Sequence, residues 1–344
     1  MYFDTEPKSS KDDFFNYEYE YGELKKALGR KERAIFIIGV RRVGKTSLMN
    51  LLYNEIKSLK IWIDGRIVSE PKKEIFAAIY EAAKLGKSKI FGKIESLNVS
   101  AFGIGFDIKV GSETTAEIEK KIHGAGHICV FVDEAQRMKR DDLAATLSYF
   151  YDRFPRVSFI ISGSEVGLVE EVIGEDDAEH PLYGRSVIKI SMDRLDKNRA
   201  MEFLKRGFAQ LKVEIKGEEI EEAITELDGL IGWLTLYGYE KGVMKNKAAL
   251  KKTTEIAARI AASELLHFFK NRKNQRLYIS ILRNAAGTSW DELKAEVSKE
   301  LREKINPNLF AFAMRNLMDY SFIEKKNEKY YLSDPLIYKA TFLV

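Results

Sequence analysis

The sequence has few of the side chains that build disulfide frameworks or metal centres. It contains one cysteine, Cys129, and four scattered histidines, His123, His127, His180 and His267. A single cysteine forms no intrachain disulfide, and the histidines do not show the spacing of metal ligands. We therefore expect neither a disulfide-stapled domain nor a zinc site.

Long apolar runs are also missing. No stretch reaches the length of a membrane-spanning helix, and the N-terminal residues do not have the pattern of a signal peptide. We expect no association with a membrane and a cytoplasmic location. Glutamine is scarce as well, occurring only at Gln136, Gln210 and Gln275, whereas lysine and glutamate are abundant, and this bias favours a thermophilic source.

Charge is plentiful but unevenly distributed. The 344 residues are 45% hydrophobic and 31% charged, which is typical of a globular protein with more than one domain. The net charge is +4, yet residues 241–344 hold 20 lysines and arginines against 11 aspartates and glutamates. This basic C-terminal part indicates either an anionic partner or simply a solvated surface.

One stretch fits the phosphate-binding pattern G-x-x-x-x-G-K-[ST], known as the P-loop or Walker A motif. It consists of Gly39, Val40, Arg41, Arg42, Val43, Gly44, Lys45, Thr46 and Ser47. The apolar run 34–38 before it predicts a strand buried on both faces, and residues 48–56 after it predict a helix. In this context the loop N–H groups and the helix N-terminus bind phosphate. Lys45 is expected to reach the β- and γ-phosphates, and the Thr46 hydroxyl to ligate Mg²⁺.

A second motif follows the apolar run 127–132. Asp133 and Glu134 come directly after this predicted strand, as in a Walker B motif. Asp133 is placed to hold Mg²⁺, and Glu134 to orient and deprotonate the attacking water. An acidic pair after a strand is also what an ordinary turn uses, but together with a P-loop it favours catalysis.

A third polar group closes the predicted strand 157–161. Ser162 and Ser164 stand at its tip, where a hydroxyl can sense the γ-phosphate. Small residues after a strand also serve ordinary turns, so both interpretations stay open here.

The remaining pattern predicts three domains. Residues 1–192 contain the phosphate-binding motifs, with polar, loosely packed residues at 1–13 and an inserted β-hairpin at about 94–110, where apolar and polar residues alternate. Residues 193–272 read as a small helical lid. Residues 273–344 read as helix, helix, helix and hairpin, which is the arrangement of a winged helix.

Together these motifs resemble the archaeal ATPase family, an AAA+ branch of the P-loop ATPases related to the STAND ATPases. The resemblance rests on residues 39–47, 132–136, 161–164, 181–185, 228–234 and 334–337. It implies an α/β fold with a parallel sheet ordered 5-1-4-3-2, followed by a helical lid and a winged helix.

The resemblance also implies binding of ATP or ADP with Mg²⁺ and hydrolysis of ATP. It assigns metal binding to Thr46 and Asp133, catalysis to Glu134, and the sensor role to Ser162 or Ser164. Arg185 resembles the arginine that reaches the γ-phosphate, either within one chain or from a neighbouring subunit of a homo-oligomer, although it could equally be a surface residue.

The sequence departs from the family pattern at two places. Tyr17-Glu18 stands where an arginine–glutamate pair is frequent, and Ile231 stands where a proline often packs on adenine. Adenine selectivity is therefore predicted less firmly than phosphate binding.

Two uses of the ATPase remain open. One is a motor acting on nucleic acid through the winged helix. The other is a STAND-like signalling switch whose winged helix binds protein or clamps the ATPase domain. The third helix, residues 308–318, offers only Arg315, Asn308 and Asn316 for reading bases, which weakens the first use, whereas the lysines at 325–329 keep it open. A helicase is excluded because no second motor domain fits in the remaining residues.

Overall fold

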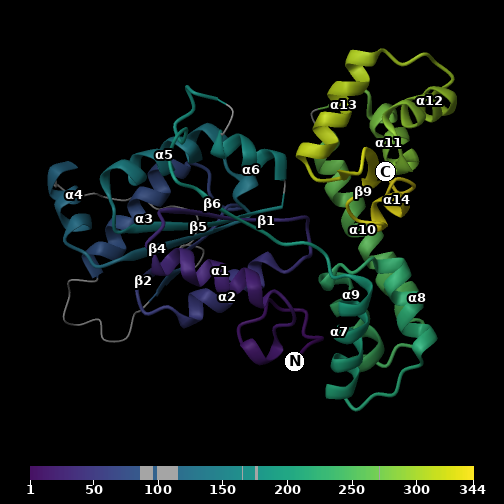
Figure 1. Ribbon diagram of the computed structural model, residues 1–344, viewed down its shortest axis with the longest axis horizontal. Coiled ribbons are helices and arrows are strands. Elements are labelled where there is room, and N and C mark those ends of the chain that lie inside the picture. The colour runs from purple at the N-terminus through teal and green to yellow at the C-terminus, as the bar shows by residue number, and fades with distance from the viewer. Residues whose placement is uncertain (86–95, 99–114, 165, 175–176, 271) are drawn as a thin grey trace. The chain divides into compact units, whose positions relative to one another are not determined.

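The computed structural model describes residues 1–85, 96–98, 115–164, 166–174, 177–270 and 272–344 (Figure 1). The chain divides into two compact units. The sheet unit comprises Tyr17–Gly39 and Lys45–Met192, and the helical unit comprises Met1–Asn16, Val40–Gly44 and Asp193–Val344. Residues 193–272 and 273–344, which we expected as two domains, therefore lie in one unit, together with five residues of the P-loop.

A parallel sheet forms the centre of the sheet unit, in the order β3-β2-β4-β5-β1-β6. Its strands are β1 (Ala34–Ile38), β2 (Leu59–Asp64), β3 (Ser96–Asn98), β4 (Ile128–Asp133), β5 (Val157–Gly163) and β6 (Ile188–Ser191). Apart from the short edge strand β3, this is the predicted order 5-1-4-3-2, which is confirmed. Every residue of β1, β4 and β5 is buried, as the unbroken apolar runs predict for central strands.

Helices cover both faces of this sheet, with α1 and α2 on one face and α3 to α6 on the other (Figure 1). Their bounds are α1 (Glu18–Gly29), α2 (Lys45–Glu55), α3 (Pro71–Leu85), α4 (Thr115–His123), α5 (Arg140–Arg153) and α6 (Val166–Ile173). Each of the strands β1, β4 and β5 is followed by a helix, namely α2, α5 and α6. Because these strands are parallel, their C-terminal ends meet at one edge of the sheet.

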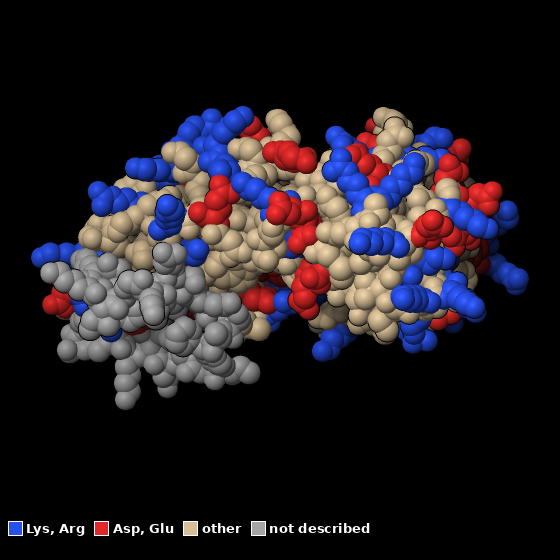
Figure 2. Space-filling view, turned by 90° about the horizontal axis from the view of Figure 1, so that it is seen from below, with Lys and Arg blue, Asp and Glu red and all other residues tan. Residues whose placement is uncertain are grey.

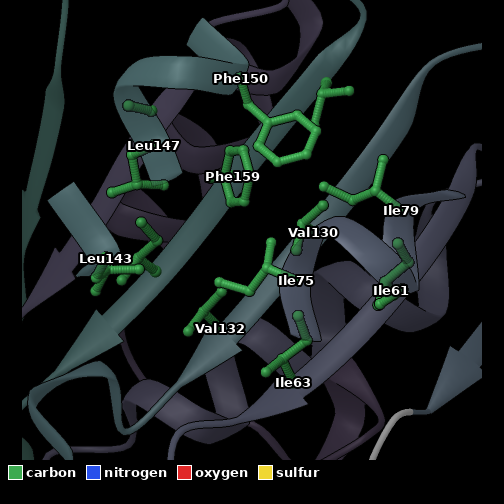
Figure 3. Close-up of a cluster of buried hydrophobic side chains, with 14 of the residues drawn as sticks. Ile61, Ile63, Ile75, Ile79, Val130, Val132, Leu143, Leu147, Phe150 and Phe159 are labelled. Carbon is green, nitrogen blue, oxygen red and sulfur yellow. The ribbon is translucent and has the colours of Figure 1, made fainter. Parts of the chain in front are cut away.

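The core of the sheet unit lies between the sheet and helices α3 and α5 (Figure 3). Val130 and Phe159 extend from the sheet towards Ile75 and Ile79 of α3 and Phe150 of α5, and all five are buried. Burying one such side chain contributes about 1.5–3 kcal/mol. This packing fixes the strand ends on which the functional residues stand.

The hairpin expected at about 94–110 lies almost wholly outside the described residues. The described part, Ser96–Asn98, forms β3 and pairs in parallel with β2.

Helices dominate the helical unit. They are α7 (Lys197–Gln210), α8 (Gly217–Leu227), α9 (Ile231–Gly238), the π-helical turn η4 (Tyr239–Val243), α10 (Ala249–Phe269), α11 (Gln275–Asn284), α12 (Trp290–Leu301), α13 (Pro307–Asp319) and α14 (Leu336–Ala340). A small antiparallel sheet, ordered β7-β9-β8, consists of β7 (Ala286–Thr288), β8 (Ile323–Lys326) and β9 (Lys329–Leu332). No helix in the described part of the chain is both long and apolar enough to cross a membrane.

Most of residues 1–13 are exposed, but Phe3 is packed, which corrects the prediction of loose packing at this one residue. Phe3 is fully buried in the helical unit and makes edge contacts with Phe203 and Phe208 of α7. A Cβ at Gly207 or Gly238 would come within 2.4 Å of the Phe3 ring. Two glycines far apart in the sequence therefore create the space for one aromatic ring, and no local pattern in residues 1–13 signals this.

Candidate functional site

The phosphate-binding loop connects β1 to α2. Its backbone has positive φ angles at Arg42 (φ 70°) and Gly44 (φ 100°), and turns of this kind can form an anion-binding concavity of N–H groups. Helix α2 begins at Lys45, whose side chain is 7% exposed and whose Nζ donates to the carbonyl of Gly39 at 2.7 Å. The lysine side chain thus folds back to the first residue of the loop, and Lys45 itself begins a helix whose N-terminal N–H groups favour an anion.

A buried carboxylate joins the first turn of α2 to the ends of two strands. Thr46 Oγ1 donates to Asp133 Oδ2 at 2.9 Å, and Ser162 Oγ donates to Asp133 Oδ1. Burial raises the pKa of Asp133, and the hydrogen bonds from Ser162 and Thr46 act in the opposite direction. The ends of the neighbouring strands β4 and β5 lie side by side. This brings together three residues that the sequence motifs predicted, Thr46, Asp133 and Ser162.

The chemistry of this cluster fits Mg²⁺. Hydroxyl and carboxylate oxygens are hard ligands, and proteins often hold Mg²⁺ with only one or two carboxylates plus the phosphates of a nucleotide. The described residues contain no group of three or more histidines, cysteines, aspartates or glutamates that could hold a metal without such help. Thr46 and Asp133 are the residues whose oxygens could take part in this shared form of ligation.

Glu134 follows Asp133 at a sharp turn. Its backbone is left-handed (φ 54°), and the 3-10 turn Ala135–Arg137 begins directly after it. The turn brings Gln136 close enough to donate to Glu134 Oε2 at 2.5 Å and to Ser164 Oγ at 2.9 Å. Ser164, the second serine of the predicted sensor pair, thus contacts Gln136, whereas Ser162 contacts Asp133.

A glycine outside the sequence motifs permits this turn. Gly65 follows β2, and its N–H donates to the carbonyl of Asp133 at 2.8 Å. A Cβ at Gly65 would lie 2.4 Å from the carbonyl oxygen of Glu134. Only its position directly after a strand beside the acidic motif could have drawn attention to it.

Arg185 is not brought to these residues. It precedes β6, whereas the phosphate-binding loop follows β1, the parallel neighbour of β6, so the two lie at opposite ends of the strands. The Arg185 guanidinium binds both carboxylate oxygens of Asp152, at 2.9 and 2.7 Å, and this contact lowers the pKa of Asp152. Within one chain, Arg185 is a structural ion-pair residue.

The two arginines of the phosphate-binding loop have partners in the helical unit. Arg42 pairs with Glu264 of α10 at 2.7 Å and with Asp334 at 3.3 Å, and its guanidinium lies 4.1 Å from the ring centre of Trp233. Arg41 lies 3.6 Å from Glu264. The sequence motif gives no sign of these partners, because the pairs are separated by more than 190 positions in the chain.

Comparison with known proteins identifies this arrangement. The model of a family described as an ATPase domain predominantly from Archaea matches residues 14–236. Among solved structures, the chain is similar to the Walker-type ATPase PABY2304 of Pyrococcus abyssi, at 28% identity over 99% of this chain and 100% of that one, with a TM-score of 0.78.

More distant likenesses include the ORC2 protein of Aeropyrum pernix, at 12% identity, 95% and 92% coverage and a TM-score of 0.49. The RuvB branch migration motor of Thermotoga maritima is similar at 14% identity, 96% coverage of both chains and a TM-score of 0.45. A comparison with curated protein sequences gives no match. Because the family model covers more than half of the chain, this protein is an ATPase that belongs to the family of ATPase domains found predominantly in Archaea.

Proposed function

We propose that the chain hydrolyses ATP in a Mg²⁺-dependent reaction at the loop between β1 and α2. The observation that carries this proposal is the cluster of Thr46, Asp133 and Ser162, which gathers hard oxygen ligands beside the loop lysine, Lys45. The loop N–H groups and the Lys45 ammonium hold the β- and γ-phosphates of ATP, and the same groups hold ADP after the reaction.

The roles of the other residues follow from the same cluster. Thr46 and Asp133 would hold Mg²⁺, which when bound neutralises charge on the phosphate oxygens. Ser162 orients the carboxylate of Asp133 through its hydrogen bond. Glu134, which is partly exposed at the end of β4, accepts a proton from the attacking water.

The substitution Glu134→Gln tests this assignment, because the amide keeps the shape of the side chain and loses the base. We expect binding of Mg-ATP within about twofold of wild type and a turnover lower by about 100-fold or more. Calorimetry and steady-state phosphate release measure the two quantities. Glu171→Gln, which changes an exposed carboxylate of the same unit, is the matched control. Wild-type turnover of Glu134→Gln would rule out Glu134 as the base.

We further propose that Arg185 acts in trans, in a homo-oligomer. Its place at the opposite end of the strands from the phosphate-binding loop disfavours action within one chain. Mixing inactive Arg185→Ala with inactive Glu134→Gln should restore part of the activity, because some interfaces then pair an intact arginine with an intact base. Full activity of Arg185→Ala alone, with a monomer in light scattering in the presence of ATP, would contradict this role.

Two uses of ATP hydrolysis are proposed. In the first, residues 273–344 form a winged helix that contacts nucleic acid. Its support is the basic hairpin β8–β9, although Lys325 pairs with Glu328 at 2.8 Å and Lys326 with Glu324 at 3.0 Å. Helix α13 exposes Phe312, at 60%, where a base-reading helix would carry polar groups.

The second use is a nucleotide-dependent switch in which the C-terminal residues clamp the phosphate-binding loop. The ion pairs of Arg42 with Glu264 and Asp334 favour it, because they fix a loop residue that sits two positions before Gly44. Glycine at position 232 is part of the clamp: its N–H donates to the Arg42 carbonyl at 2.9 Å, and a Cβ would lie 2.9 Å from the Arg42 side chain.

The substitution Glu264→Gln tests the switch. It weakens the ion pair with Arg42 and keeps the side-chain shape, so we expect the basal ATPase rate or the ATP affinity to change by about threefold or more. Glu255→Gln on the exposed face of the same helix is the matched control. Unchanged rate and affinity in Glu264→Gln would contradict the clamp.

A further inference from the structure

We propose that Gln136 is a positioning residue for ATP hydrolysis, which holds the carboxylate of Glu134 and ties it to Ser164 at the tip of β5. This inference rests on the proposed role of Glu134 as the base. The sequence motif gave Gln136 no function. The proposal gives a reason for its hydrogen bonds to Glu134, after β4, and to Ser164, after β5.

The orientation of the Gln136 amide is set by Ser164. The backbone N–H of Ser164 donates to Gln136 Oε1 at 3.3 Å, and Gln136 Nε2 donates to Ser164 Oγ at 2.9 Å. Because a backbone N–H can only donate, the amide oxygen must face it. The amide nitrogen is thereby turned towards Glu134.

The second amide hydrogen then reaches the proposed base. Gln136 Nε2 lies 2.5 Å from Glu134 Oε2, so one N–H₂ group serves both Ser164 and Glu134. A carboxylate has two oxygens, and holding Oε2 fixes the direction of Oε1, which we assign as the proton acceptor. A base held in one orientation loses less conformational freedom when water is deprotonated.

The backbone makes this contact possible. The left-handed turn at Glu134 and the 3-10 turn after it place residues 134 and 136 on the same side. The Arg137 N–H donates to the Glu134 carbonyl at 2.9 Å and closes the turn. Gly163 at the tip of β5 is required by its neighbour Val169, because a Cβ there would lie 2.4 Å from the Val169 side chain; its 3.6 Å from Gln136 Oε1 is an ordinary contact distance.

A double-mutant cycle tests the proposal on the full-length chain. We expect Gln136→Ala to lower kcat by about 10- to 100-fold, with binding of Mg-ATP in calorimetry within about twofold of wild type. In the Glu134→Gln background the same substitution should lower kcat by less than about twofold, because the carboxylate that Gln136 orients is already gone. The exposed Gln275→Ala is the matched control and should match wild type.

Ser164→Ala supplies a second variant if Gln136→Ala does not fold. It removes the hydroxyl acceptor and keeps the backbone N–H, so kcat should fall by less than in Gln136→Ala and ATP binding should stay unchanged. Wild-type kcat in both variants, beside a slow Glu134→Gln, would overturn the role of Gln136 alone. Equal losses from Gln136→Ala in both backgrounds would also overturn it. Wild-type turnover in Glu134→Gln would overturn the base and Gln136 together.

Discussion

Among the described residues of the sheet unit, Lys45 and Asp133 are charged side chains that are buried together with hydrogen-bond partners. Lys45 and Asp133 are both less than 10% exposed and lie at the same end of the sheet. Burying an unpaired charge would cost several kcal/mol, so the hydrogen bonds to Gly39, Thr46 and Ser162 are needed even before a nucleotide binds.

Substitution of Lys45 by alanine should weaken ATP binding. In the proposed role the Lys45 ammonium binds the phosphates, so we expect the dissociation constant of Mg-ATP to rise by about 10- to 100-fold, or about 1.5–3 kcal/mol. Calorimetry measures it, and Lys57→Ala, which removes an exposed lysine just beyond α2, is the control. If Lys45→Ala bound Mg-ATP with wild-type affinity, the assignment of this loop as the phosphate site would be wrong.

Cys129 should behave as an inert thiol. It is fully buried in β4, and burial raises its pKa to about 12. The thiolate is the reactive form, so at pH 8 the folded protein should react with a disulfide reagent at least about 100-fold more slowly than the unfolded chain. Fast labelling of folded protein would show that β4 opens to solvent.

At the scale of elements, glycines decide where helices and loops approach one another. Gly229 precedes α9 in a left-handed conformation (φ 66°), and its carbonyl accepts from the Leu195 N–H at 2.9 Å. A Cβ at this position would lie 2.0 Å from the Leu195 carbonyl oxygen. Both the backbone conformation and the close approach therefore require glycine.

Gly229→Ala should destabilise the helical unit by about 1–3 kcal/mol, because alanine adds both left-handed strain and a clash with backbone. The free energy of unfolding in urea, followed by circular dichroism, measures the change. Gly217→Ala is the control: Gly217 begins α8 and has open space around its Cβ position, so its change should stay within about 0.5 kcal/mol. Equal effects of the two substitutions would refute the steric argument.

Over the whole molecule, charge is mixed more than the sequence totals suggest. Figure 2 shows lysines and arginines standing among acidic residues on the visible face. In the hairpin β8–β9, Lys325 and Lys326 are already paired with carboxylates, which reduces their attraction for phosphate. The excess positive charge of residues 241–344 is therefore expected to give a weak electrostatic surface without sequence reading.

Binding of duplex DNA should consequently be weak, independent of sequence and steeply sensitive to salt. Each neutralised phosphate changes the slope of log K against log salt by about −0.9. Fluorescence anisotropy at low and moderate salt, with the intact chain and with Lys325→Glu/Lys326→Glu, measures this slope. No binding at low salt would eliminate the nucleic-acid use and leave the switch. Tight, salt-resistant and sequence-specific binding would contradict the prediction of a weak surface.

Features that depend on residues close together in the chain can be predicted from the sequence. The run Ala34–Ile38 has no polar side chain and predicts a strand buried on both faces, which the structure confirms. The glycines and Lys45–Thr46 that follow it, between a predicted strand and a predicted helix, indicate a phosphate-binding loop, and together with this loop the acidic pair after β4 indicates a Walker B motif. The strand order came from resemblance to a family that uses these motifs.

Contacts between residues far apart in the chain depend on the tertiary structure. The Phe3 ring fills the space beside Gly207 and Gly238. The Arg42 guanidinium donates a hydrogen bond to Asp334, which is 292 positions away in the chain. Ser162 binds Asp133, whereas Ser164 binds Gln136, although both serines end the same strand. A side chain contacts only atoms within a few ångströms, and the packing of whole helices and strands determines which residues lie within that distance. Local sequence patterns carry no information about this packing.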